Sequence, residues 1–509
     1  QRSEQFEFNS KLDAASEIHQ IGESALMVLF ELYKETKESK WIDIAFQLMD
    51  QTKAIVLAEE RGFKDLAEKN PKMRVMLRKQ NALKFQRSRF ESDIKKVGIE
   101  NADNTTELLR VKKRLSELDK ESQLLDQDIR ALFPSYRREA SAKLEGKALV
   151  QLKSKLKKKN ASVLSYFVGD RQVYAITGVP GRFKFTQFSK ENLTDRTISF
   201  MGALNTPGSS SPEDYSQAAK SIFDLLIGKE VENRAENWVV LPDGMLNGLP
   251  FEAMVSDTKG GSFKKLNYLV RDHVIHYAPS AFFFAHEGLG ENAKESFLGI
   301  APVFKNSKEY EFLPKSKGEL ESGTSLFSGE ELTDEKATKK QFFSKAERYD
   351  ILHISTHAGT NSGTNNDAWM VFSDSKSTDY KLEAHELLKL DLPASLVVLN
   401  ACETGSGTVF RGEGPMSLAR GFLNAGSEST VTNLWSVNHE SNAVIMKSFY
   451  ENLSETQSPS QSLNEAKLDY LASSEVDDAG AHPYYWSSAI LIGTDAPVIA
   501  PSTFSMMAW

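Results

Sequence analysis

From residue 160 to residue 495, short apolar runs alternate with segments in which apolar residues recur every three or four positions. The runs have the length of buried strands, and the periodic segments have the length of helices. Strands that alternate with helices favour a mainly parallel sheet with helices packed on both faces. The alternation therefore predicts an α/β fold for this part of the chain.

The same pattern places the individual elements. The predicted strands cover 163–168, 172–176, 237–242, 268–277, 297–301, 349–357, 396–399, 429–435 and 486–492, and the first two form a β-hairpin. The predicted helices cover 212–226, 313–327, 338–346, 414–425 and 441–453, and a further helix opens at Pro279–Ser280.

Two of the predicted strands end in side chains that can act chemically. The run Leu396–Leu399 leads to Cys402, the only cysteine among 509 residues, and an upstream run leads to His357. His357 is followed by Ala358 and Gly359, and Cys402 is followed a little later by Thr404 and Gly405. The carboxyl ends of parallel strands are where open α/β sheets place their sites. If these strands are parallel neighbours, we expect His357 and Cys402 to lie close together.

A cysteine beside a histidine suits nucleophilic catalysis. A thiol with a pKa of about 8.5 is only slightly ionised near neutral pH, and the thiolate is the nucleophile. The imidazole of His357 can take the thiol proton and later protonate a leaving amine. Backbone N–H groups stabilise the oxyanion of such a reaction. We expect these donors at Ala358 or Gly359 and at Cys402, and the sequence indicates no third member beyond the pair.

The composition of the chain excludes several kinds of site and several classes of protein. A single cysteine excludes an internal disulfide framework and a cysteine-based zinc site, which favours a reducing, cytoplasmic location. The sequence contains neither a signal peptide nor an apolar run long enough to cross a bilayer. A net charge of −8 argues against a general nucleic-acid binder. We expect no cofactor, no metal, no membrane contact and no direct nucleic-acid partner.

The N-terminal residues have a different, helical texture. Residues 14–37 and 41–62 carry apolar residues at helical spacing on either side of a short polar turn. Such an αα-hairpin suits one tetratricopeptide-type repeat, within a region we assign to residues 1–69. One repeat cannot bury its apolar face alone, so we expect further repeats before Gln1.

Residues 70–159 are predicted to be helical and strongly charged. A helix from Lys72 to about Val97 and another from about Thr105 to Phe133 form a long antiparallel hairpin. A further helix ends at Lys159, and the domain boundary falls near 160. The basic side chains are interpreted as a solvated helix face, with a nucleic-acid surface as the alternative. Residues 496–509 form a C-terminal tail.

Several motifs between residues 160 and 495 resemble those of one family. They are LHISTH at 352–357, LNACETG at 399–405, LPDG at 241–244, LPFE at 249–252, YAPSA at 277–281, RGEG at 411–414, LWSV at 434–437 and YYW at 484–486. Together they resemble the CHAT domain, a caspase-like fold of the caspase and separase clan of cysteine peptidases. The helices before it resemble the tetratricopeptide region that commonly precedes this domain. The histidine of a caspase likewise lies about 50 residues before its cysteine.

The resemblance implies roles for particular residues. His357 would be the general base and Cys402 the nucleophile of a cysteine endopeptidase. Asn400 would line the S1 pocket, and because it is neutral we expect no selection of Arg or Lys by an ion pair there. Glu403 and Glu440 join Asn400 as predicted substrate-binding residues. This chain departs from many relatives at Ala358, where they have glycine, and at 438–440, where they often carry an acidic pair.

The resemblance also implies a protein substrate and control by a partner or ligand bound through the N-terminal helices, in bacterial defence. Stacked helical repeats offer a concave surface for such a partner. The alternative function is a non-catalytic caspase-like scaffold or protein-binding module. His353 and His357 lie four residues apart and could suggest a metal site, but that spacing suits metal only on a helix. We interpret His353 as a core or orienting residue.

Overall fold

The computed structural model of the chain describes residues 4–58, 61, 70–80, 82–83, 86, 105–133, 148–228, 235–285, 296–304, 309–311, 313–360, 368–374, 379–401, 405, 409–411, 413–415, 417–456 and 458–498. Cys402, Glu403 and most of the predicted tail lie outside the described residues. The rest of the predicted charged helix beyond residue 86 and the turn before Thr105 lie outside them as well.

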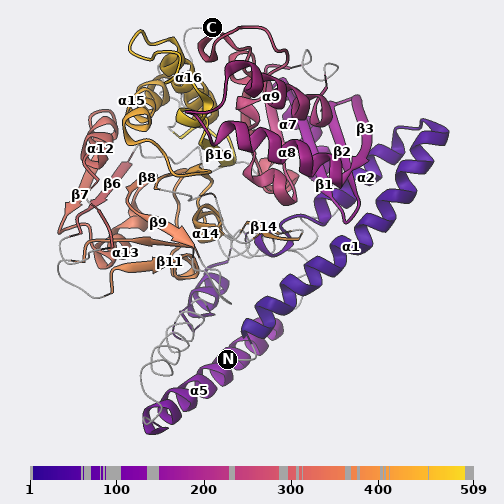
Figure 1. Ribbon diagram of the computed structural model, residues 1–509. Coiled ribbons are helices and arrows are strands. Elements are labelled where there is room, and N and C mark those ends of the chain that lie inside the picture. The colour runs from indigo at the N-terminus through magenta and orange to yellow at the C-terminus, as the bar shows by residue number, and fades with distance from the viewer. Residues whose placement is uncertain are drawn as a thin grey trace, which may run out of the picture.

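A single large sheet organises the α/β part (Figure 1). Its strand order is β3-β2-β1-β4-β5-β16-β15-β12-β8-β6-β7. The strands are β1 (Ala161–Val168), β2 (Gln172–Val179), β3 (Arg182–Ser189), β4 (Asn237–Leu241), β5 (Val274–Tyr277), β6 (Ser296–Pro302), β7 (Ser328–Asp334), β8 (Ile351–Ser355), β12 (Leu396–Asn400), β15 (Ser429–Asn433) and β16 (Ala489–Gly493).

Most neighbouring strands in this sheet are parallel, as predicted. The antiparallel pairs are β1–β2, β2–β3 and β15–β16. Because β16 is parallel to β5 but antiparallel to β15, the two parallel sets run in opposite directions. The carboxyl ends of β8 and β12 therefore lie at the edge opposite to those of β4 and β5.

Helices cover both faces of the sheet, which confirms the predicted fold class. One face packs against α8 (Lys190–Leu204), α9 (Pro212–Leu226), α12 (Ser316–Thr324), α15 (His439–Thr456) and α16 (Pro459–Ala472). The other packs against α2 (Lys40–Gln51), α7 (Ala148–Lys158), α11 (Ala281–Ala285), α13 (Lys339–Lys345) and α14 (Leu418–Ala425). Strands buried on both sides need continuous apolar runs, which is why the sequence pattern located them.

The strand before His357 and the strand before Cys402 are direct parallel neighbours. In their register Ile351 lies opposite Leu396, and Ser355 lies opposite Asn400. The last residues of the two strands are thus paired. This meets the condition under which His357 and Cys402 are expected to lie close together.

The sequence pattern did not predict two sets of short strands, the first of which follows β8 directly. A small antiparallel sheet contains β9 (Ala358–Thr360), β10 (Ala368–Val371) and β11 (Lys381–Glu383). A second pairs β13 (Val409–Phe410) with β14 (Gly414–Pro415). Strands of two to four residues are too short to show a period, so they give no sequence signal.

Several predicted boundaries are wrong. The strand predicted over 268–277 begins only at Val274, because Leu269–Arg271 form a tight helical turn. The helix predicted over 414–425 begins at Leu418, since Gly414 has φ of 77° and Ser417 caps the helix by accepting from the N–H of Arg420. The last strand begins at Ala489 rather than at residue 486.

The helix predicted over 41–62 is also interrupted. Here α2 ends at Gln51, Ala54 has a φ of 48°, and helix resumes at 55–58. The break lets the buried side chain of Lys53 donate to the carbonyl oxygen of Leu241 at 2.9 Å. A contact across the tertiary structure thus overrides local helical periodicity.

The N-terminal helices extend beyond the α/β part in Figure 1. Helix α1 (Glu4–Thr36) is longer than predicted and turns into α2 at Lys37, which has a φ of 58°. Helix α5 (Thr105–Leu132) packs against the helix over 71–80 through an apolar cluster that includes Met73, Leu118 and Ile129. The domain boundaries themselves stay a prediction. Within the described ranges no helix is long and apolar enough to cross a membrane.

Candidate active site at the ends of β8 and β12

His357 follows β8 by two residues, and one of its ring nitrogens is fixed by the backbone. Its Nε2 atom lies 2.8 Å from the carbonyl oxygen of Glu311. A carbonyl oxygen can only accept, so Nε2 carries the proton in this hydrogen bond. The neutral imidazole therefore presents Nδ1 as its acceptor, which is the atom that a general base uses.

Aromatic side chains surround the same imidazole. The ring centroids of Phe304 and Tyr310 lie 5.3 and 5.6 Å from that of His357. Trp369 on β10 lies 6.0 Å from Tyr310 in an edge-on arrangement. All three side chains are half-buried. Phe304 and Tyr310 thus pack against the half-buried imidazole, and Trp369 supports Tyr310.

Cys402 lies outside the described residues, but the chain leading to it is described as far as Ala401. The N–H of Thr356 donates to the carbonyl oxygen of Asn400 at 3.3 Å, so pairing continues one step beyond β8. His357 comes two residues after Ser355, and Cys402 comes two residues after its partner Asn400. This equal spacing is consistent with the predicted pair, whose distance stays a prediction.

The candidate oxyanion donors lie on β9. The N–H of Val371 donates to the carbonyl oxygen of His357 at 3.1 Å. Hydrogen-bonded and non-hydrogen-bonded pairs alternate along an antiparallel ladder. The register pairs Ala358 with Met370 and Gly359 with Trp369. The alternation thus turns the N–H of Gly359 toward Trp369 and that of Ala358 away from β10, where it can meet an oxyanion.

Gly359 has a separate packing role. A Cβ atom at this position would lie 2.9 Å from the indole ring of Trp369. Cβ atoms in proteins essentially never come this close to another side chain. Glycine is therefore required for the close approach of the strand to the ring. The preceding Ala358 is half-buried and packs against the apolar cluster that includes Met370 and Leu382.

Asn400, the predicted S1 residue, is buried with both ends of its amide engaged. Its Nδ2 donates to the carboxylate of Glu319 on α12, and its Oδ1 accepts from Nδ2 of Asn442 at 2.7 Å. Asn442 lies in the first turns of α15. A polar network thus fixes the orientation of Asn400 at the end of β12.

Of the two other predicted substrate-binding residues, Glu403 and Glu440, the structure describes only Glu440. Glu403 lies outside the described residues, whereas Glu440 is exposed in the first turn of α15. Asn438 begins this helix, since its Oδ1 accepts from the N–H groups of Glu440 and Ser441, each at 3.0 Å. An acidic side chain at a helix N-terminus is favourable whatever its other role.

His353 is a core residue rather than a metal ligand. Its ring is fully buried, and Nδ1 lies 2.6 Å from the hydroxyl of Tyr450 on α15. Burial lowers the pKa of His353 to about 3, so the ring is neutral. In the part of the chain that the structure describes, no group of His, Cys, Asp and Glu side chains could hold a metal ion.

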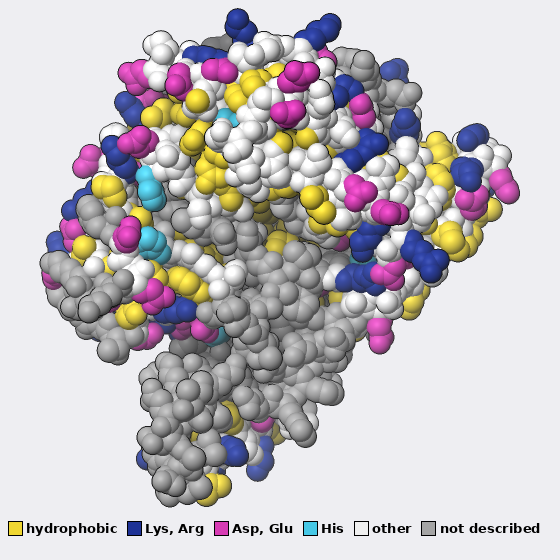
Figure 2. All heavy atoms as spheres, viewed as in Figure 1, with side chains coloured by type: hydrophobic (Ala, Val, Ile, Leu, Met, Phe, Trp, Pro, Cys, Tyr) yellow, Lys and Arg dark blue, Asp and Glu magenta, His cyan; other side chains and the backbone are white. Residues whose placement is uncertain are grey.

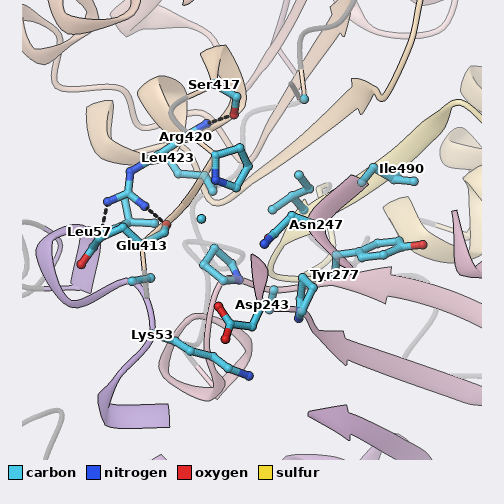
Figure 3. A pocket seen from close by; sticks show the side chains of 18 residues that line it. Lys53, Leu57, Asp243, Asn247, Tyr277, Glu413, Ser417, Arg420, Leu423 and Ile490 are labelled. Atoms are coloured by element: carbon cyan, nitrogen blue, oxygen red, sulfur yellow. Dashed lines mark hydrogen bonds and ion pairs between the residues drawn. The ribbon is translucent and has the colours of Figure 1, made fainter. Parts of the chain in front are cut away.

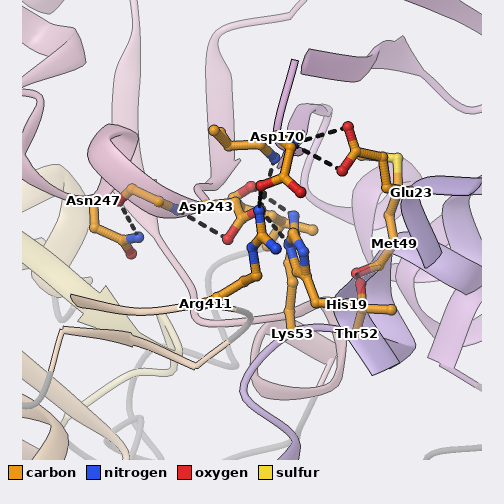
Figure 4. Close-up of polar contacts among 12 residues, drawn as sticks. His19, Glu23, Met49, Thr52, Lys53, Asp170, Asp243, Asn247 and Arg411 are labelled. Carbon is orange, nitrogen blue, oxygen red and sulfur yellow. Dashed lines mark hydrogen bonds and ion pairs between the residues drawn. The ribbon is translucent and has the colours of Figure 1, made fainter. Parts of the chain in front are cut away.

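A second polar cluster joins the N-terminal helices to the α/β part (Figure 4). Nε2 of His19 on α1 lies 3.0 Å from Oδ2 of Asp243, and the same oxygen accepts from the N–H of Val168 at 2.7 Å. These bonds hold the pKa of Asp243 below its usual value although burial acts in the opposite direction. Nearby, burial lowers the pKa of Lys53 to about 8.

A buried glutamate continues this contact into the segment that follows Cys402 (Figure 3). The carboxylate of Glu413 accepts from the N–H of Val56 at 2.9 Å and from the guanidinium of Arg420 at 2.5 Å. Glu413 thereby satisfies a free N–H group at the start of the resumed helix. Arg61 reaches the α/β part as well, with an ion pair of 2.5 Å to Glu428, directly before β15.

A small cavity of about 60 Å³ lies between these groups, lined by Lys53, Asp243, Asn247, Tyr277, Glu413 and Arg420 among others (Figure 3). This volume accommodates a few water molecules. It lies between the helices and the segment after Cys402, so it belongs to their interface.

Over the face in Figure 2, both signs of charge are interspersed among the coloured side chains.

Three residues of this site were missed by the sequence interpretation. Glu311 contributes a backbone carbonyl, which leaves no trace in a sequence. Asn442 is an ordinary polar residue of a predicted helix. Glu319 did leave a signal, because it falls on the buried stripe of α12 together with Ser316, Leu320 and Gly323.

The chain is similar to a known protein family and to known proteins. A family model described as the CHAT domain matches residues 216–494. Curated relatives named Tetratricopeptide repeat protein 28 are 33% identical in Homo sapiens and 34% identical in Mus musculus, over 122 residues. The match covers 24% of this chain and only 5% of each relative, so the chain spans a small part of their length.

Solved structures show a weak similarity. A chain of the Saccharomyces cerevisiae separase–securin complex matches with a TM-score of 0.46 and 9% identity, over 71% of this chain and 31% of that chain. RgpB of Porphyromonas gingivalis matches with a TM-score of 0.37 and 13% identity, over 61% of this chain and 78% of that chain. Scores this low say nothing about activity.

Proposed function

Because the chain belongs to the CHAT domain family, we propose that it is a cysteine endopeptidase that cleaves a protein substrate with His357 as general base and Cys402 as nucleophile. One observation carries the proposal. The strands that lead to these residues are parallel neighbours, with Ser355 opposite Asn400. Each candidate residue follows its strand by the same two positions.

The hydrogen bond from His357 to Glu311 supports the chemistry. With the proton on Nε2, Nδ1 can take the proton of the Cys402 thiol. The sulfur then attacks the substrate carbonyl carbon, and the peptide bond breaks as Nδ1–H protonates the leaving amine. Water, deprotonated by the same imidazole, hydrolyses the thioester and restores the thiol. The carbonyl of Glu311 supplies the orienting group that such a pair otherwise lacks.

The proposed oxyanion donors are the N–H groups of Ala358 and Cys402. The ladder between β9 and β10 favours Ala358 over Gly359 for this role. Donors fixed on the backbone stabilise developing charge without reorganisation. Asn400, Glu403 and Glu440 remain the proposed substrate-binding residues.

We also propose that a protein partner controls the activity through the N-terminal helices. Support comes from two contacts that engage the segment after Cys402. Glu413 accepts from the N–H of Val56, and Arg411 pairs with Asp170 (Figure 4). Asp170 is in turn held by Glu23 of α1, whose carboxylate accepts from the N–H of Asp170 at 2.8 Å. A displacement of the helices would therefore act on that segment. The role in bacterial defence stays a prediction from the resemblance.

The test uses the full chain with candidate protein substrates encoded beside it, and N-terminal sequencing of the products. Wild type should cleave one of them, while Cys402→Ala and His357→Ala should each lose at least about a thousandfold in rate. If Cys402→Ala processes the substrate as fast as wild type, the peptidase proposal is wrong. The scaffold alternative then stands.

A further inference from the structure

One carboxylate lies beneath the ends of both strands that lead to the proposed catalytic pair. Glu319 on α12 is only 2% exposed. Its Oε2 accepts from the hydroxyl of Ser355 at 2.8 Å and from Nδ2 of Asn400. Ser355 and Asn400 are the last residues of β8 and β12, and they are opposite each other in the register. A single oxygen atom thus bridges the two strand ends.

A third element completes this arrangement. Asn442 of α15 donates to the amide oxygen of Asn400 at 2.7 Å, and its amide acts against burial by lowering the pKa of Glu319. The amide of Asn400 is therefore held from both ends, and α12, β8, β12 and α15 meet at this carboxylate. Ser355, Asn400 and Asn442 are all less than a tenth exposed.

The donors that hold Glu319 are all neutral. Among the residues that the structure describes, the titratable groups facing it from packed elements are Tyr450 on α15 and, bonded to that hydroxyl, His353 on β8. Burial raises the pKa of Tyr450 well above its usual value and lowers that of His353 to about 3, so both are uncharged. A carboxylate buried without a cation costs folding free energy. The fold tolerates that cost at the point where the two strand ends are joined.

We propose that Glu319 is a positioning residue for the peptidase reaction, which holds the ends of β8 and β12 together and so fixes the approach of His357 and Cys402. The inference rests on the proposed function. Glu319 is buried beneath Asn400, so it acts through Ser355 and Asn400 rather than by touching substrate. A misplacement of about 1 Å at a reacting centre can cost a hundredfold in rate.

The test needs no substrate, because it measures the reactivity of the Cys402 thiol itself. Cys402 is the only cysteine of the chain, so any alkylation of cysteine reports on it. The rate of its alkylation by iodoacetamide is measured from pH 5 to pH 10 by mass spectrometry of the intact protein. Wild type is compared with His357→Ala, Glu319→Ala and the isosteric Glu319→Gln. Glu321→Ala is the matched control, since Glu321 is exposed on the same helix.

His357→Ala should move the profile toward that of a free thiol, with a pKa of about 8.5. Glu319→Ala should move it in the same direction and slow alkylation at pH 7 about tenfold. Glu319→Gln should restore most of the rate, because its amide oxygen can accept the same two bonds. Glu321→Ala should match wild type.

The possible failures are distinguishable. If His357→Ala leaves the profile unchanged, the catalytic pair is wrong and both proposals fall. If His357→Ala changes it and Glu319→Ala does not, the role of Glu319 alone is overturned. Should Glu319→Ala not fold by circular dichroism, Ser355→Ala removes one of the two bonds instead. A wild-type profile for Ser355→Ala then overturns the inference, and a partial shift supports it.

Discussion

The Nε2 atom of His357 donates to the carbonyl oxygen of Glu311 across 2.8 Å. This contact joins the segment after β6 to the segment after β8, two neighbouring strands of the sheet. It sets the tautomer of the imidazole without any acidic side chain. The site therefore depends on how the backbone after β6 is held, and Tyr310 contributes to that through its contact with the ring.

The oxyanion assignment can be tested by removing one N–H group. Ala358→Pro deletes the donor that faces away from β10, so the ladder with β10 keeps its hydrogen bonds. We expect the rate of substrate cleavage to fall about a hundredfold to a thousandfold with little change in KM. Steady-state kinetics on a cleaved protein substrate measure this.

Thr360→Pro is the matched control. Thr360 lies on the same strand, two residues further on, and its N–H also faces away from β10 in the alternation. It is exposed and lies farther from His357 along the strand. If both variants lose activity equally, strand distortion rather than a lost donor explains the effect.

The pH dependence of stability should report on Glu319. Burial raises its pKa from 4.5 to about 7 in the fold. Between these values the unfolded chain ionises while the folded protein keeps the proton. The group thus contributes stability below pH 4.5 that is lost as the pH rises through 7.

Chemical denaturation at several pH values checks this sign. Relative to wild type, Glu319→Gln should gain about 3 kcal/mol in unfolding free energy between pH 4.5 and pH 8. Asp50, whose pKa burial raises to about 6, titrates in both proteins and cancels from the difference. A difference between the two proteins that does not vary with pH would show that Glu319 titrates normally.

The contact between Glu413 and the helical region should be important for stability. Glu413→Ala removes the partner of the buried Arg420 guanidinium and the acceptor for the N–H of Val56. Breaking a buried pair on one side typically costs about 3–5 kcal/mol. We expect a lower midpoint of urea unfolding followed by tryptophan fluorescence.

Lys447→Ala is the control for this prediction. Lys447 pairs with Glu451 at 3.9 Å on the exposed side of α15. Exposed pairs of this kind contribute little to stability. A Glu413→Ala midpoint no lower than that of Lys447→Ala would contradict the importance of the contact.

The neutral side chain of Asn400 leads to a prediction about which residue the protein prefers before the scissile bond. Its amide is neutral, and both of its ends are engaged by Glu319 and Asn442. We expect a peptide library cleaved by the wild-type protein to show no preference for Arg or Lys before the scissile bond. Preferred cleavage after Arg or Lys that disappears in Asn400→Ala would refute this.

Much of the sheet around the site could be predicted from the sequence. Strands buried on both faces need continuous apolar side chains, so the runs before His357 and Cys402 were visible. The alternation with helices predicted a mainly parallel sheet. That these two strands are direct neighbours was a condition of the prediction, and only the structure shows it. The short strands β9 and β10 were not visible, although they orient Ala358, because their length shows no period.

The site residues divide in the same way. Motif residues such as His357 and Asn400 were found because their side chains carry the resemblance. Glu311 was not found, since any residue at that position offers the same carbonyl oxygen. Glu319 lay within a predicted helix, yet its partners are 36 and 81 residues away in the chain. No local pattern connects residues at such separations.

By itself the sequence determined the α/β class, the strands that end before His357 and Cys402, and the helical character of the N-terminal residues. These depend on the period of apolar side chains, which is a local property. The tertiary structure alone decided the reversal of direction between β15 and β16, the break in helix after Gln51, and the joining of two strand ends by Glu319. Each of these satisfies buried polar or backbone groups with partners distant in sequence, which only the folded chain brings together.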